Sequence, residues 1–158
     1  MREKTKDAAQ TAVLNIFETM FFMFLDPIEE EMAEVALSLQ ENIEFLESEI
    51  RFKGKESGFL RIQMSYPLAE NLTMNFMGFE DEATEEQILD MASELSNMVC
   101  GNIFSLLDKT SVYILDSPKT RKVTPGEMAV DKDPSNITLD FLSDGQKVTL
   151  VIHFDNNS

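Results

Sequence analysis

Residues 90–102 read DMASELSNMVCGN and lie in the longest helical pattern of the chain, which we expect to run from about 84 to 108. At about 100° per residue, one face of this helix is apolar. That face carries Ile88, Ala92, Leu95, Val99, Ile103 and Leu106. The opposite face carries a polar stripe, made of Asp90, Glu94, Asn97 and Gly101. The apolar face predicts a helix packed on a core, but it does not explain the stripe.

The polar face of an amphipathic helix is ordinarily only solvated, and spacing alone favours that interpretation of the stripe. Two residues of the stripe argue against a face that is only solvated. Asn97 is a poor helix former, and this face offers no packing reason for it. Gly101 costs about 1 kcal/mol relative to Ala in the middle of a helix, which indicates a close backbone approach there.

The elements before this helix predict a hairpin and a further short helix. An acidic stretch, residues 29–42, leads to residues 43–53, which pair as strands with the alternating residues 59–66. Pro67 opens a short helix that Gly78 ends. The long helix then begins with a capping-box pattern, formed by Thr84 and Gln87.

The first helix is expected over about residues 7–25, with Pro27 ending it. Its predicted apolar face consists of Ala9, Val13, Ile16, Phe17, Met20 and Phe24. Phe22 falls among the polar residues of this helix, where a large apolar side chain indicates a contact with a partner or a second subunit.

The C-terminal part of the chain predicts three strands. Residues 111–116 are strand-like, and residues 117–136 form a polar, proline-containing excursion. Residues 136–142 and 147–154 form a final hairpin around the turn at 143–145. The order of helix, two strands, two helices and three strands predicts an α+β fold, with helices packed on an antiparallel sheet.

Length and charge limit the classes of function. The 158 residues suit one domain over 1–158, with a tail from about 155 that we expect to be flexible. The net charge of −16 disfavours nucleic acid and anionic membrane surfaces as partners. It fits either attraction to a basic partner or simple solubility. The N-terminal apolar run is interrupted by Asn15 and Glu18 and is too short to span a bilayer, so we expect a cytoplasmic protein.

Cysteine and histidine, two residue types that commonly carry catalysis or bind metals, occur once each. Cys100 is the single cysteine, which excludes an internal disulfide and a cysteine-based zinc site. A nucleophilic pair of Cys100 with the single histidine, His153, is disfavoured, because a lone cysteine is usually a small buried apolar residue. Asp90 and Glu94 alone are too few ligands for a dedicated metal site.

The spacing Asp90-x3-Glu94-x2-Asn97, continued by Met98-Val99-Cys100-Gly101-Asn102, resembles the signature of the CheX/CheC family of chemotaxis phosphatases. That signature is Asp or Ser, three residues, Glu, two residues and Asn. The first helix, the hairpin, the short helix and the C-terminal strands resemble the CheX layout over most of the chain. The resemblance therefore implies a CheC-like/CheX-like fold.

The resemblance also implies an activity and a partner. In that family the Glu and the Asn reach into a phosphorylated CheY-type response regulator and promote hydrolysis of its aspartyl phosphate. Glu94 and Asn97 are then the expected catalytic residues, with Asp90 and Gly101 as partner-binding residues. We expect the protein to need no cofactor of its own, and Mg²⁺ to belong to the receiver domain of the partner.

Three readings remain open from the sequence. The first is a response-regulator phosphatase in chemotaxis or another two-component pathway. The second is a non-catalytic adaptor of the same fold that binds a receiver or a flagellar-switch partner, and the third is an acidic domain without such a partner. CheC-like members carry a second motif on the first helix, but here Glu18 is followed by Phe21 where Asn is needed. One site per chain and a CheX-like homodimer are expected, with residues 117–136 as a candidate for strand exchange.

Overall fold

The computed structural model of the chain describes residues 2–39, 42–78, 81–128 and 133–155. The tail expected to be flexible, from about 155, lies beyond these residues except for Asp155. In chain order the elements are α1 (Arg2–Phe21), β1 (Asp26–Ile28), α2 (Glu30–Ser38), β2 (Phe45–Lys53), β3 (Gly58–Ser65), α3 (Tyr66–Met77), α4 (Glu85–Leu107), β4 (Ile114–Leu115), β5 (Lys119–Val123), β6 (Ile137–Ser143) and β7 (Gln146–Phe154).

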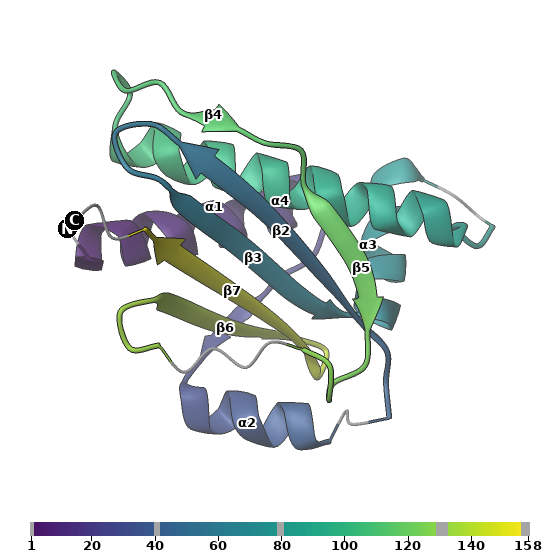
Figure 1. Ribbon diagram of the computed structural model, residues 1–158. Coiled ribbons are helices and arrows are strands. Elements are labelled where there is room, and N and C mark those ends of the chain that lie inside the picture. The colour runs from purple at the N-terminus through teal and green to yellow at the C-terminus, as the bar shows by residue number, and fades with distance from the viewer. Residues whose placement is uncertain (1, 40–41, 79–80, 129–132, 156–158) are drawn as a thin grey trace.

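The strands form one antiparallel sheet in the order β1-β6-β7-β3-β2-β4, with β5 also paired to β2 (Figure 1). One edge of β2 pairs with β3, and β4 and β5 share its other edge. Asp144 and Gly145 adopt positive φ values of 49° and 77°, which suits a tight hairpin turn between β6 and β7. The predicted α+β class, with helices packed on an antiparallel sheet, is confirmed.

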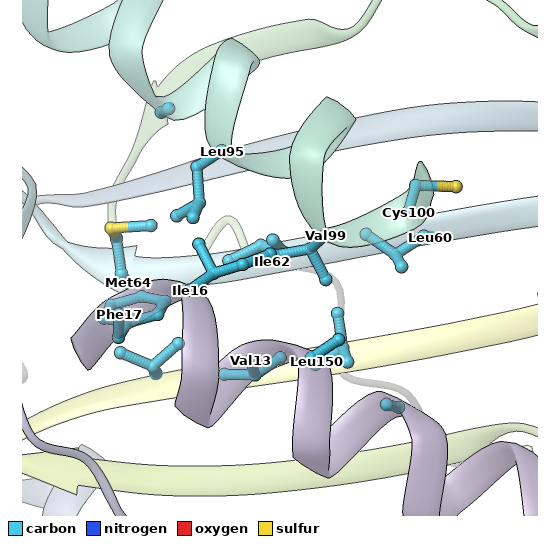
Figure 2. Close-up of a cluster of buried hydrophobic side chains, with 14 of the residues drawn as sticks. Val13, Ile16, Phe17, Leu60, Ile62, Met64, Leu95, Val99, Cys100 and Leu150 are labelled. Carbon is cyan, nitrogen blue, oxygen red and sulfur yellow. The ribbon is translucent and has the colours of Figure 1, made fainter. Parts of the chain in front are cut away.

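The main core lies between the sheet and the helices α1 and α4. Figure 2 shows side chains from both helices meeting those of the strands in one cluster. Its labelled members are Val13, Ile16 and Phe17 from α1, Leu95, Val99 and Cys100 from α4, and Leu60, Ile62, Met64 and Leu150 from β3 and β7. Full burial of one such aliphatic side chain stabilises the fold by about 1.5–3 kcal/mol. The apolar side of α4 is therefore fixed firmly against the sheet and α1.

The other face of the sheet is more polar, and a buried carboxylate joins three of its strands. Glu47 on β2 is 6% exposed. It accepts hydrogen bonds from Gln63 Nε2 on β3 at 2.9 Å and from Arg121 Nη2 on β5 at 2.8 Å. Burial alone raises the pKa of Glu47, but these two bonds and the charges of Arg61 and Arg121 outweigh it and leave that pKa lowered. The carboxylate thus holds β5 to β2.

The first helix differs from its prediction at both ends, since it begins at Arg2 and not near residue 7. α1 ends at Phe21, because Phe22 adopts a left-handed φ of 56° and Met23 N donates to Phe17 O at 3.0 Å. Met20 and Phe24 are therefore exposed, Phe24 at 73%, and the prediction that both join the apolar face is wrong. Phe22 is exposed at 71%, in agreement with its expected position outside the core.

The structure also contains elements that the sequence pattern did not predict. The acidic stretch 29–42 contains α2, which contacts β6 and β7, and its Leu37 packs against a small second cluster of Phe45, Val123 and Met128. The predicted strand over 111–116 is reduced to the two residues of β4. The excursion over 117–136 contains β5, which pairs with β2 of the same chain.

Candidate functional site

The helix α4 carries the polar stripe and begins with the predicted cap. Thr84 Oγ1 accepts from Gln87 N at 3.2 Å, and Gln87 Oε1 accepts from Thr84 N at 2.9 Å. This capping box satisfies two of the free amide groups at the start of the helix. The helix then continues without a break to Leu107. The stripe is thus part of a rigid element of 23 residues.

The stripe residues face away from the core. Asp90, Glu94 and Asn97 are exposed, whereas Leu95 and Val99 on the other side of α4 are fully buried. Glu94 and Asn97 stand one turn apart on one face, so both can enter a single cleft of a partner. Within the described part of the chain, neither side chain makes a hydrogen bond or an ion pair. Both are therefore available to an external ligand.

A chain of hydroxyl groups lies beneath this pair and joins α4 to two strands. Ser93 Oγ lies 2.6 Å from Thr120 Oγ1 on β5, and Thr120 Oγ1 donates to Ser48 Oγ on β2 at 2.8 Å. Ser48 Oγ lies 2.9 Å from Ser96 Oγ, which returns the chain to α4. Ser93 directly precedes Glu94 in the sequence, and Ser96 directly precedes Asn97. We define these four residues as the hydroxyl chain.

The sequence pattern gave little indication of the hydroxyl chain. Ser48 gave one usable signal, since it stands between Leu46 and Ile50 on the buried side of β2, where an apolar residue is the rule. Thr120 gave none, because β5 reads Lys-Thr-Arg-Lys-Val and lacks apolar alternation. Its partners are visible only once the strands are paired.

Gly101 lies one turn after Asn97, at the start of a groove. A Cβ atom added to Gly101 meets nothing within 4 Å, so no described part of this chain makes the close approach that the glycine indicated. The groove has a volume of about 520 Å³ and is lined by Gly101, Phe104, Ser105, Asp108, Lys109, Ser111, Tyr113 and Leu115.

Leu106 in the last turn of α4 is 46% exposed and does not join the predicted apolar face.

The carboxylate of Asp108 stabilises the chain at the far end of the groove. It accepts hydrogen bonds from Ser111 Oγ at 2.6 Å and from Thr110 Oγ1 at 2.8 Å. These bonds, together with the backbone amide of Thr110, hold the pKa of Asp108 well below its usual range. Tyr113 stacks on Phe104 with ring centroids 4.0 Å apart. The part of the groove wall that follows α4 is therefore held in place by its own contacts.

The other chemically reactive residues do not gather into a site. Burial raises the pKa of the Cys100 thiol to about 12, which removes its nucleophilic form at neutral pH. His153 on β7 is engaged with Asn136 Oδ1, 2.8 Å from its Nδ1 atom. Among the described residues, no three His, Cys, Asp or Glu side chains are grouped so as to hold a metal ion. No helix in the same part of the chain is long and apolar enough to cross a membrane.

Comparison with known proteins gives one family and a set of similar structures. The model of the family described as chemotaxis phosphatase CheX matches residues 48–142, which include the whole of α4. The chain is similar to chemotaxis protein CheX from Vibrio vulnificus, with 20% identity, a TM-score of 0.78, and 98% of this chain and 99% of that chain covered. No curated protein sequence matches significantly.

Two further structures extend the likeness. A CheC-like superfamily protein from Shewanella sp. PV-4 shares 21% identity at a TM-score of 0.77, with 99% of this chain and 100% of that chain covered. A structure from Borrelia burgdorferi, a complex of CheX with CheY, BeF₃ and Mg²⁺, shares 17% identity at a TM-score of 0.67, with 98% and 97% covered. These likenesses confirm the predicted CheC-like/CheX-like fold.

Proposed function

The chain belongs to the CheX family of chemotaxis phosphatases, and from this premise we propose that it hydrolyses the aspartyl phosphate of a CheY-type response regulator. The observation that carries the proposal is the pair Glu94 and Asn97, which are exposed on the outer side of α4 and have no side-chain partner among the described residues. The similar B. burgdorferi structure contains a CheX protein together with CheY, which supports a receiver domain as the partner.

The chemistry of an acyl phosphate explains why an amide and a carboxylate suffice. Water attacks phosphorus in line, the bond between phosphorus and the aspartyl oxygen breaks, and inorganic phosphate leaves while the carboxylate is restored. Because the leaving group is already good, the water needs orientation more than it needs a strong base. The carboxamide of Asn97 can hold this water without adding a charge that repels the phosphoryl oxygens.

Glu94 has a different role in this proposal. Its carboxylate pairs with the lysine of the receiver site and fixes the position in which the two proteins dock. The receiver supplies the Mg²⁺ that neutralises charge on the phosphoryl group, and this chain contributes no cofactor. Asp90, one turn before Glu94, and Gly101, one turn after Asn97, contact the receiver on either side of the pair.

We propose that the protein acts as a homodimer. The turn between α1 and β1 exposes Phe22 and Phe24 at 71% and 73%. Met32 and Val35, on α2, are also exposed, and they line a second hollow together with Pro27 and Ile28. Exposed large apolar side chains are typical of a contact surface.

Two alanine substitutions test the division of roles. Asn97→Ala is expected to lower the hydrolysis rate at saturation by about 10²-fold or more while sparing most of the receiver affinity. Glu94→Ala is expected to weaken the complex as well, since it leaves a receiver lysine unpaired. Asp90→Ala, further from the amide, should change both quantities less than either of these substitutions.

The measurement is single-turnover release of phosphate from a labelled receiver, at saturating and subsaturating protein. Circular dichroism melts control for stability, which should change little because all three residues are exposed and Ala favours helices. If Asn97→Ala keeps wild-type turnover at saturation, Asn97 does not position the water. If wild-type protein binds the phosphorylated receiver and releases no phosphate, the protein is an adaptor of the same fold.

A further inference from the structure

The hydroxyl chain is unusual for its place in the fold. The contact between α4 and the sheet is otherwise built from fully buried apolar side chains such as Ile50, Leu95 and Val99. Ser48 and Ser96 are also buried, at 1% and 0% exposure. A buried hydroxyl group costs free energy unless it is hydrogen-bonded, whereas an apolar residue of similar size at either position would pack without that cost. In the hydroxyl chain both groups are hydrogen-bonded, which offsets this cost and adds a directional constraint that apolar residues would not supply.

Hydrogen bonds restrict the orientation of a helix in a way that apolar contacts do not. An apolar surface tolerates small rotations of α4, but the distances of 2.6 to 2.9 Å in the hydroxyl chain hold only in one setting. Side-chain tips lie about 6 Å from a helix axis, so a rotation of about 20° moves them by about 2 Å. A misplacement of about 1 Å in a reacting group can lower a rate by about 10²-fold.

The hydroxyl chain lies where it can most affect the position of the proposed catalytic pair. Ser93 is followed directly by Glu94, and Ser96 by Asn97. Ser96 Oγ also donates to Ser93 O at 2.9 Å, which connects both ends of the chain through the helix itself. Between these ends lies Thr120 on β5, a strand that the contact of Arg121 with Glu47 holds to β2.

We propose that Thr120 and Ser48 are positioning residues, which set the rotation of α4 through Ser93 and Ser96 and so place Asn97 for hydrolysis. This inference rests on the proposed phosphatase function. Neither residue touches the receiver, and both act through the helix. β5 thereby contributes to catalysis, although its residues lie far from the motif in the sequence.

Thr120 offers a matched pair of substitutions. Thr120→Val keeps the shape of the side chain and suits a strand, but it removes the hydroxyl group that joins Ser93 to Ser48. Thr120→Ser keeps the hydroxyl group and removes a methyl group. We expect Thr120→Val to lower kcat by about tenfold with KM changed less than twofold, and Thr120→Ser to restore kcat to within about twofold of wild type.

Thr149→Val is the control. Thr149 Oγ1 donates to Asp140 Oδ1 at 2.7 Å in the same sheet, and its side chain points to the opposite face because Val148 and Leu150 lie in the main core. This variant loses a comparable bond, and its kcat should stay at the wild-type value. Turnover is measured on phosphorylated receiver, well below the melting temperature of every variant. Ser48→Ala breaks the hydroxyl chain at β2 and should lower kcat to a similar extent. This variant tests the proposal if Thr120→Val does not fold.

The outcomes separate the two proposals. Absence of phosphate release by the wild-type protein overturns the phosphatase function itself. If the wild type is active, loss of activity in Asn97→Ala together with unchanged kcat in folded Thr120→Val and Ser48→Ala overturns the positioning role alone. A fall of kcat in Thr120→Ser equal to that in Thr120→Val also overturns it, because the hydroxyl group is then irrelevant.

Discussion

Gly101→Ala should stabilise the free protein and weaken its complex with the receiver. A Cβ atom at this position meets no atom of the chain within 4 Å, so the new methyl group causes no internal strain. Ala is favoured over Gly in a helix interior by about 1 kcal/mol. For a protein of 158 residues this corresponds to a rise in melting temperature of about 2–4 °C.

The effect on binding has the opposite sign. If the receiver packs its backbone or a side chain into the groove at Gly101, the methyl group overpacks the contact, which typically costs about 1–3 kcal/mol. A cost of about 1.4 kcal/mol weakens binding tenfold. The free protein and the complex thus respond in opposite directions to a single added carbon.

The assay combines thermal melts with titration of a CheY-type receiver in beryllium fluoride and Mg²⁺, the additives in the B. burgdorferi complex. Gly126→Ala is the control, because Gly126 lies in the turn after β5 and an added Cβ there also meets nothing within 4 Å. It should leave the dissociation constant unchanged. A Gly101→Ala protein that melts higher and binds the receiver as tightly as the wild type would refute the docking role of Gly101.

Three further outcomes are expected. Receiver binding should require phosphorylation. It should also weaken as salt rises, because Glu94 and the −16 charge attract a basic feature of the receiver. Equal affinity for both receiver forms at all salt concentrations contradicts this prediction. Light scattering at micromolar concentration should give a dimer, and a mass near 18.0 kDa argues against it. The lowered pKa of Glu47 means that its contribution to the unfolding free energy is complete above pH 4.5 and lost as pH falls through the folded value. Glu47→Gln should flatten denaturant-measured stability across that acidic range.

The elements predicted correctly are those whose side chains follow a regular period. The stripe and the buried side of α4 repeat every three to four residues over 23 residues, and Thr84, Gln87 and Gly78 fix the helix ends by local chemistry. The hairpin of β2 and β3 was also predicted from a regular period, which is the alternation of apolar and polar residues along a strand. Local rules thus place the candidate catalytic pair on its helix and direct it outward.

The elements that were missed depend on contacts between distant parts of the chain. β5 pairs with β2 and is also held there by the bonds of Arg121 to Glu47 and of Thr120 to Ser48, none of which appears in its sequence as apolar alternation. α1 stops at Phe21 because Phe22 turns into a left-handed conformation, a choice that periodicity cannot signal. The partners of the hydroxyl chain come from three elements, and only the paired sheet brings them together.

The position of β7 in the sheet has a consequence for synthesis. β7 lies between β3 and β6, and its pairing joins Gly58 to Phe154, almost a hundred residues later in the chain. Until residues 146–154 have been synthesised, β3 and β6 each keep an unpaired edge. The core also lacks Leu150, one of its buried side chains. Such long-range closure is slow and leaves a nascent chain open to aggregation. Truncations that remove β7, residues 146–154, should therefore prevent the fold from forming, although α4 is complete some forty residues earlier.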